Sequence, residues 1–119
     1  MPQDENSKRF DLEDRTFAFA KRSRALVKRL PKTIGNIEDA RQLVRSSGSV
    51  GANYIEANES LSKKDFICRI KICRKEAKES RYWLRLMEVV DDIVSEREAL
   101  VQEAQELMNI FGAIMRKSE

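Results

Sequence analysis

The chain has 119 residues, of which 41% are hydrophobic and 36% are charged, with four glycines and two prolines. This length suits one domain with one core, and the scarcity of glycine and proline favours long helices over a β-rich fold. The longest uncharged stretch, residues 46–55, falls short of the about 20 apolar residues that cross a bilayer. The first nine residues lack the apolar segment of a secretion signal, so we expect a cytoplasmic protein with no membrane partner.

The first expected helix begins at Asp11 and ends at Leu30, because Pro31 prevents the helical backbone from continuing. Asp11 is the expected N-cap, with Asp14 as the acid three residues later. Residues 1–10 are expected to be disordered or partly ordered, which leaves a single domain at residues 11–117. Hydrophobic residues follow helical spacing along this first helix, namely Phe17, Ala20, Val27 and Leu30, and Phe19 and Leu26 widen this apolar stripe.

The second expected helix is capped by Asn36 and extends from Ile37 to about Asn58. Gly48 and Gly51 lie inside it, and each glycine costs about 1 kcal/mol relative to alanine. We therefore expect close packing to compensate, and we disfavour a phosphate-binding loop because no G-x-x-x-x-G-K-[ST] pattern is present. Two neighbouring faces carry the small residues, one formed by Gly48, Ala52 and Ile55 and the other by Ser47, Gly51 and Tyr54.

The third expected helix has the clearest start, with Ser62 as N-cap, Asp65 three residues later, and Leu61 and Phe66 spaced as a hydrophobic staple. Its apolar seam alternates steps of four and three residues, as in a helical bundle. The seam comprises Phe66, Ile70, Cys73, Ala77, Ser80, Leu84 and Met87, and a second apolar patch beside it comprises Trp83, Leu86 and Val90.

The fourth expected helix starts with Ser95 and Glu98 as a capping box and ends near Arg116 and Lys117. Short connections between long helices favour antiparallel neighbours. The sequence therefore predicts an all-α fold, an antiparallel up-down-up-down four-helix bundle. The apolar positions of the fourth helix are Leu100, Ala104, Leu107, Phe111 and Ile114.

Charge is distributed unevenly along the chain, although the total is only +3. Residues 1–35 carry +4, residues 36–59 carry −2, residues 60–86 carry +6 and residues 87–119 carry −5. A basic stripe on the third helix is a candidate for binding nucleic-acid phosphates; the alternatives are a solvated face or one neutralised by the acidic fourth helix. The candidate nucleic-acid-binding residues are Lys64, Lys71, Arg74, Lys75, Lys78 and Arg81.

Other polar residues receive structural interpretations. Asn53, Glu56 and Glu59 follow one another at steps of three, and we interpret them as a polar clamp between helices or subunits. Carboxylate metal sites in bundles usually include histidine, and this chain has none, so we expect no metal. Cys68 and Cys73 lie about 140° apart around a helix, so we expect two free, buried thiols.

We expect no catalytic residues and no cofactor. The chain has no histidine, no cysteine beside an evident base and no glycine-rich nucleotide loop. The usual general bases and activated nucleophiles are therefore missing. Three classes of function remain in decreasing order of preference: a nucleic-acid-binding oligomer, a protein scaffold or adaptor, and an enzyme.

Four sequence segments together resemble the four-helix bundle proteins related to the 23S ribosomal RNA intervening-sequence proteins. They are residues 41–53 (RQLVRSSGSVGAN), 56–57 (EA), 62–66 (SKKDF) and 75–86 (KEAKESRYWLRL). The resemblance extends over roughly residues 10–115, and its most specific feature is the small-residue helix followed by the Ser-x-x-Asp-Phe start.

This resemblance implies an antiparallel four-helix bundle that assembles as a homo-pentameric ring, with no catalytic residues to carry over. The patch formed by Trp83, Leu86 and Val90 suits an inter-subunit contact, because a monomer would leave it in water. The family is also similar to accessory proteins of diversity-generating retroelements, which are basic barrels that bind nucleic acid and a reverse transcriptase. The expected partners are therefore a further copy of the chain, RNA or DNA, and a reverse transcriptase or another protein.

Overall fold

The computed structural model describes residues 5–119, with side chains from residue 11 onward. Four helices follow one another: α1 (Glu5–Val27), α2 (Ile34–Asn58), α3 (Lys63–Leu86) and α4 (Asp91–Ser118). No strand occurs within these described residues. Of the expected N-terminal segment, residues 1–4 lie outside the described part of the chain. None of the four helices combines the length and apolarity needed to cross a bilayer.

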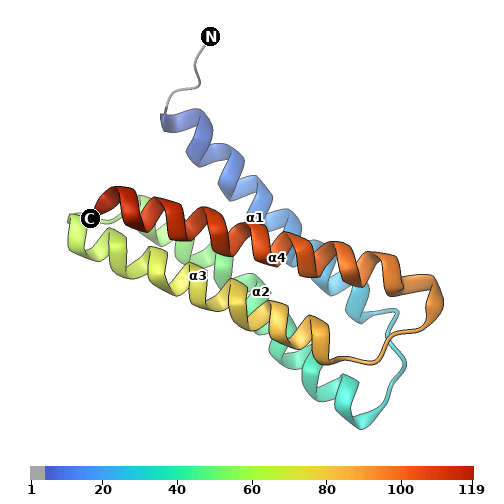
Figure 1. Cartoon of the computed structure of the whole chain (residues 1–119). Helices are drawn as coiled ribbons and strands as arrows, with labels where there is room; N and C mark the ends of the chain where they lie inside the picture. Colours follow the sequence, from blue (N-terminus) through green and yellow to red (C-terminus); the bar gives the residue numbers. More distant parts are fainter. Residues whose placement is uncertain (1–4) are drawn as a thin grey trace.

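The helices form a bundle in which sequence neighbours are also spatial neighbours (Figure 1). The α2–α3 and α3–α4 contacts are the most extensive. Helix α1 packs mainly on α2 and makes a smaller contact with α4, so each helix has two neighbours. The α1–α2 and α3–α4 turns lie together at one end of the bundle (Figure 1). The predicted four-helix fold is confirmed.

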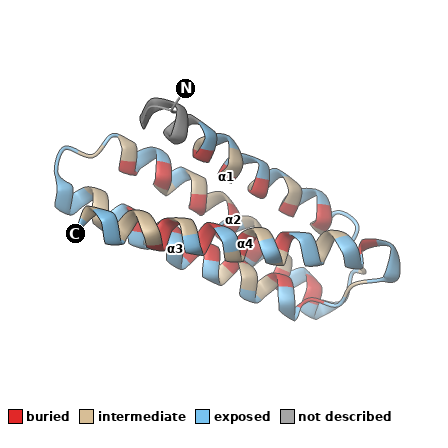
Figure 2. Ribbon diagram, turned by 45° about the horizontal axis from the view of Figure 1, so that its top comes forward, coloured by how far each residue is buried: buried red, intermediate tan, exposed pale blue. Residues whose placement is uncertain are grey.

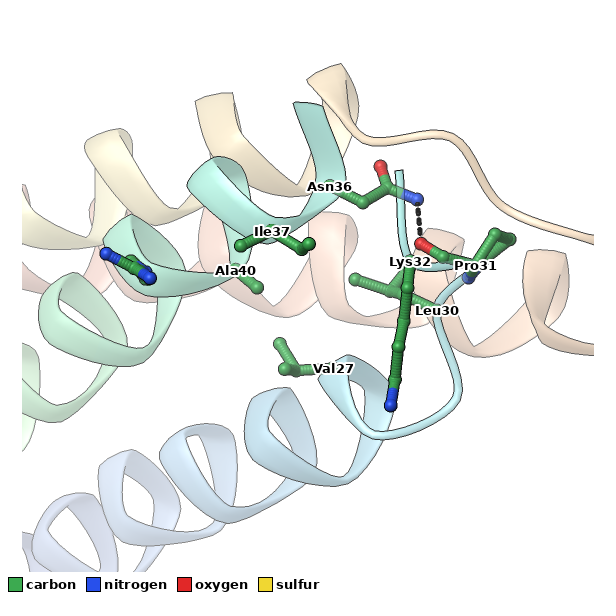
Figure 3. A pocket seen from close by; sticks show the side chains of 8 residues that line it. Val27, Leu30, Pro31, Lys32, Asn36, Ile37 and Ala40 are labelled. Atoms are coloured by element: carbon green, nitrogen blue, oxygen red, sulfur yellow. Dashed lines mark hydrogen bonds between the residues drawn. The ribbon is translucent and has the colours of Figure 1, made fainter. Parts of the chain in front are cut away.

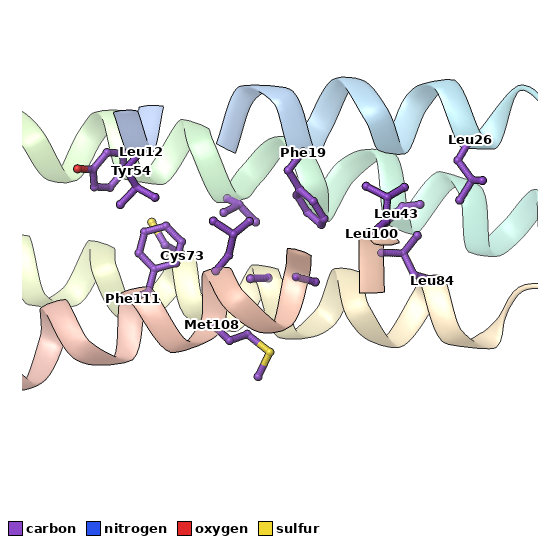
Figure 4. Close-up of a cluster of buried hydrophobic side chains, with 14 of the residues drawn as sticks. Leu12, Phe19, Leu26, Leu43, Tyr54, Cys73, Leu84, Leu100, Met108 and Phe111 are labelled. Carbon is purple, nitrogen blue, oxygen red and sulfur yellow. The ribbon is translucent and has the colours of Figure 1, made fainter. Parts of the chain in front are cut away.

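All four helices contribute one stripe of side chains to a common core (Figures 2 and 4). The expected seam of α3 is buried from Ile70 to Met87, while Phe66 at its start is half-buried. Burial of a large apolar side chain contributes about 1.5–3 kcal/mol, so this stripe supplies most of the drive for packing α3. The largest fully buried side chains include Phe19, Leu26, Leu43, Ile70, Leu84, Ile93, Leu100, Leu107 and Phe111.

The small-residue stretch is helical, as predicted, and one of its two faces makes the expected close approach. A Cβ atom added to Gly51 would lie 2.9 Å from Thr16 Oγ1 and 3.2 Å from Thr16 Cβ, so α1 rests almost directly on the α2 backbone there. On the α3 side, the Ser80 hydroxyl donates to Ser46 Oγ over 2.8 Å. A Cβ at Gly48 would meet only the end of the Arg24 side chain at 3.9 Å. Among the described residues, no other helix packs closely on the face containing Gly48.

The expected cap of α3 is confirmed, because Ser62 Oγ accepts a hydrogen bond from the backbone N–H of Asp65. The staple beside it is wrong, since the Leu61 side chain is 99% exposed and does not cover Phe66. The chain enters α3 through an exposed turn, and nothing folds Leu61 back onto the helix.

The expected starts of the other helices are wrong. Thr33, and not Asn36, caps α2, while the Asn36 side chain bridges the two turns by donating to the carbonyl oxygens of Pro31 and Glu88, each over 2.9 Å. The Asn36 Oδ1 atom also accepts from the backbone N–H of Glu88. A side chain that resembled a local cap is therefore used for a contact between turns.

Helices α1 and α4 also begin earlier than their expected caps. Helix α1 starts at Glu5, so Asp11 lies inside it, and it ends at Val27 although Leu30 is still buried. Helix α4 starts at Asp91, so Ser95 is interior. The acidic residues Asp91 and Asp92 favour a helix N-terminus through the helix dipole, and no breaker separates them from Ser95.

Candidate nucleic-acid interface

The outer side of α3 carries a row of exposed cations. Packing of Ile70, Cys73 and Ala77 into the core fixes the rotation of α3, so the opposite side of the helix faces solvent. We define the basic face as the exposed residues Lys64, Lys71, Arg74, Lys75, Lys78 and Arg85. Five of these were predicted from the sequence; Arg85 was not among the candidate residues, although it lies seven residues after Lys78 on the same side of the helix.

Within the described residues, the basic face has almost no acidic partners. Only Lys75 makes an ion pair, with its Nζ atom 3.9 Å from Glu76 Oε1. The sixth predicted residue, Arg81, is half-buried at the α3–α4 edge and donates to Gln105 Oε1. The structure therefore leaves five of the six predicted cations open to solvent and ties Arg81 to α4.

The basic face continues a short distance onto α4. A Cβ atom placed on Gly112 would lie 3.6 Å from Arg74 Nε and 3.3 Å from Arg116 Nη1, so both guanidinium groups cover this glycine. Arg116 thus joins the cations of α3 from the neighbouring helix. The sequence alone shows Arg116 only as a residue near the end of a helix. Its position beside Arg74 follows from the antiparallel packing of α3 and α4.

Four acidic residues of α4 pair with the arginines of α1 and of the turn that follows it. Arg15 makes two hydrogen bonds of 2.8 Å to the Glu103 carboxylate and one of 3.0 Å to Glu106. Two further pairs join Arg22 Nε to Glu96 Oε1 and Arg29 Nη2 to Asp92 Oδ2, each over 3.2 Å. We call these contacts the α1–α4 ion-pair row. Their arginines are seven residues apart, a spacing visible in the sequence; it places Arg15 and Arg22 on one side of α1, and Arg29 lies in the turn just after that helix.

Two acidic residues of α3, Glu76 and Glu79, are engaged with Arg45 of α2. Arg45 donates to Glu76 Oε2 over 2.9 Å and to Glu79 Oε1 over 2.5 Å, and the Glu76 side chain is almost fully buried. Burial raises the pKa of Glu79, but hydrogen bonds from Trp83 and Arg45 outweigh it and hold that pKa below its ordinary value. These carboxylates are therefore held mainly by Arg45, and Lys75 is the one cation of the basic face that also pairs with them among the described residues.

The predicted oligomer-interface residues differ in their surroundings. Trp83 is half-buried against the core, and its Nε1–H donates to Glu79 Oε1 over 3.3 Å. Leu86 and Val90 are 52% and 45% exposed at the α3–α4 turn. The part of this patch that remains in water is thus the turn and not the tryptophan.

The three residues of the expected polar clamp do not act together within the chain. Asn53 Oδ1 accepts from Arg69 Nη1 over 2.9 Å and therefore joins α2 to α3. Glu56 and Glu59 are exposed, and in residues 11–119 their carboxylates make no hydrogen bond or ion pair. No group of three or more His, Cys, Asp or Glu side chains is placed to hold a metal ion in the described part of the chain.

The two cysteines lie on opposite sides of α3. Cys73 is buried, and burial raises the pKa of its thiol to about 12. Cys68 is exposed, so the expectation of two buried thiols is wrong for this residue. The separation of about 140° that excludes a disulfide between them also places one outside when the other is inside.

Comparisons with known proteins agree with the fold. The model of the 23S rRNA-intervening sequence protein family matches residues 8–113. A crystal structure of a protein with unknown function, from the S23 ribosomal protein family of Bacteroides thetaiotaomicron VPI-5482, is 30% identical in sequence with a TM-score of 0.77. That similarity covers 92% of this chain and 98% of the other. No curated protein matches the sequence. The family match over nearly the whole chain shows that this protein belongs to the 23S rRNA-intervening sequence protein family.

Proposed function

We propose that this protein is a self-associating, non-enzymatic bundle that binds the phosphate backbone of RNA through the basic face of α3. The observation that carries the proposal is the row of exposed lysines and arginines on α3, of which only Lys75 makes an ion pair within the described residues. Membership of a family described by 23S rRNA makes RNA the first nucleic acid to test.

The dimensions of the basic face suit a backbone contact. From Lys64 to Arg85 the helix rises about 30 Å, at about 1.5 Å per residue. Cations along such a line displace the counterions of several phosphates, which gives attraction without sequence preference and a steep dependence on salt. Tyr82 is 58% exposed among these cations and offers a ring on which an unpaired base can stack.

RNA binding at 50 mM salt tests this proposal directly. The double substitution Lys71→Glu with Lys75→Glu should weaken binding by more than about tenfold and flatten the dependence on salt. Lys21→Glu with Lys28→Glu changes the net charge equally at exposed positions outside the basic face and is the matched control. The proposal fails if the parent protein binds neither RNA nor DNA, or if both double variants lose affinity equally.

A protein scaffold is the second candidate function. The exposed apolar side chains Leu86 and Val90 favour it, because a contact between proteins would remove them from water. The family resemblance implies a homo-pentamer as the assembled state. Sedimentation velocity at micromolar concentration measures this state, and a monomer would contradict both the ring and the scaffold.

A further inference from the structure

An open cavity lies between the end of α1 and the start of α2 (Figure 3). Its volume is about 210 Å³, below the about 300–1,000 Å³ of typical small-molecule sites, and it is large enough for individual side chains. Its walls are mainly apolar, and two cationic side chains, Lys32 and Arg41, also line it. The lining residues are Val27, Leu30, Pro31, Lys32, Asn36, Ile37, Ala40 and Arg41.

Within the described residues, several side chains at this cavity remain exposed or lack a charged partner. Ile37 is 43% exposed at the cavity, and Ile34 beside it is 85% exposed. Among the described residues, neither Lys32 nor Arg41 has an acidic partner. A complementary occupant would therefore present apolar side chains flanked by carboxylates.

The α3–α4 turn of this protein has that chemistry. Leu86, Val90 and Val94 are 52%, 45% and 37% exposed. Glu88 and Asp91 are exposed beside them, and their carboxylates make no ion pair in the part of the chain that the structure describes. The turn thus combines projecting apolar side chains with two unpaired negative charges.

The α1–α2 turn, whose residues line the cavity, lies at the same end of the bundle as the α3–α4 turn (Figure 1). Asn36 fixes their relative position through its hydrogen bonds to the backbone of Glu88, and the Arg29–Asp92 ion pair supports it. The turn of a given chain does not line the cavity of that same chain. Two copies lying side by side with the same end up would bring the turn of one level with the cavity of the next.

We propose that the α3–α4 turn of one copy docks into the α1–α2 cavity of a second copy. Leu86 and Val90 enter the apolar cavity, while Glu88 and Asp91 face Lys32 and Arg41. The two surfaces differ, so the contact is heterologous, and its repetition closes a ring when the rotation between copies allows it. This inference rests on the self-association included in the proposed function and identifies the surfaces that produce it.

Charge reversal tests the contact. Lys32→Glu with Arg41→Glu should weaken assembly by more than about tenfold, because like charges then face each other, and Glu88→Lys with Asp91→Lys should do the same. All four substitutions in one chain restore opposite charges and should restore assembly. Size and mass come from sedimentation velocity, and circular dichroism checks the fold. If a reversal variant fails to fold, Leu86→Gln, at an exposed position, should weaken assembly by itself.

The experiment separates this inference from RNA binding. Lys71→Glu with Lys75→Glu is the control, and it should leave the assembly intact while RNA affinity falls. Assembly that persists in both reversal variants, no recovery in the fourfold variant, or a parent protein that is monomeric would each overturn the contact. An assembled parent that binds no RNA would overturn the proposed function of the basic face and leave the docking contact standing.

Discussion

The α1–α4 interface and the outer side of α3 are both rich in charge, but their arginines and lysines have different surroundings. Along the α1–α4 ion-pair row, Arg15, Arg22 and Arg29 each face a carboxylate of α4. Along the basic face, Lys64, Lys71 and Lys78 are exposed and make no ion pair with the described residues. Segment charges of similar size therefore have different consequences: the first set joins two helices, and the second remains free for a polyanion.

The rotation of α3 about its axis determines which of its cations face solvent. Its two cysteines test that rotation, because one is exposed and the other is buried. We expect the exposed Cys68 to react readily with a thiol reagent, and the buried Cys73, whose pKa is raised to about 12, to react at least about a hundredfold more slowly. Mass spectrometry after brief labelling should show one modified thiol per native chain and two in denaturant. Equal reaction rates in the native protein would mean that α3 is rotated differently and that the basic face is wrongly assigned.

The ion-pair row also depends on how closely α1 approaches α2. Replacing Gly51 with leucine would force side-chain atoms into the position of Thr16, so we expect the free energy of unfolding to fall by about 2 kcal/mol. Gly48→Leu is the matched control, because only the end of Arg24 lies near that position. Urea unfolding measures both variants. A smaller loss at position 51 than at position 48 would contradict the close contact with Thr16.

Neutralising one cation in each region tests whether a paired cation contributes more to stability than an unpaired one. Arg15→Gln should lower the free energy of unfolding by about 0.5–1 kcal/mol at 50 mM salt, because the partly buried Glu103 loses two hydrogen bonds. The loss should shrink at 1 M salt, where exposed charges are screened. Lys71→Gln should leave stability within about 0.5 kcal/mol of the parent. Equal losses for the two variants would remove the distinction between paired and free cations.

The smallest expected change in stability comes from Asp39, a buried carboxylate that belongs to neither the ion-pair row nor the basic face. It is buried without an ion pair among the described residues, and burial, assisted by the charge of Glu38, raises its pKa above the ordinary value of 3.8. At pH 7 ionised Asp39 therefore disfavours the folded state, and Asp39→Asn should raise the melting temperature slightly. The gain should vanish below about pH 3.8, where Asp39 is neutral in both states. A gain that is independent of pH would contradict this explanation.

The sequence predicted the features that depend on local periodicity. The four helices, the Ser62 cap and the seam from Ile70 to Met87 all follow from the spacing of apolar residues and one capping pattern. The positions of Lys71 and Lys78 followed as well, because a buried seam determines what lies opposite it.

Features that depend on distant partners were not predictable in the same way. Asn36 has the side chain of a cap, but its hydrogen-bond partner Glu88 lies 52 residues away. Ser95 also fits a capping pattern, yet the helix begins before it because Asp91 and Asp92 are equally suitable at a helix start. The heptad spacing of Arg15, Arg22 and Arg29 was visible, whereas the carboxylates that they meet required the antiparallel arrangement of α1 and α4.

The arginines of the ion-pair row lie seven residues apart, while their partners Glu103, Glu96 and Asp92 are spaced by seven and four residues. If α1 slid along α4 by one heptad, about 10 Å, Arg22 would come level with Glu103 and Arg29 with Glu96, so much of the attraction would survive. In that shifted register Ser23 would replace Thr16 beside Gly51, and Thr16 would move toward Asn58, where α2 carries a side chain. Electrostatic attraction alone would therefore tolerate more than one register, and the bare backbone at Gly51 favours the one in which Thr16 lies against it.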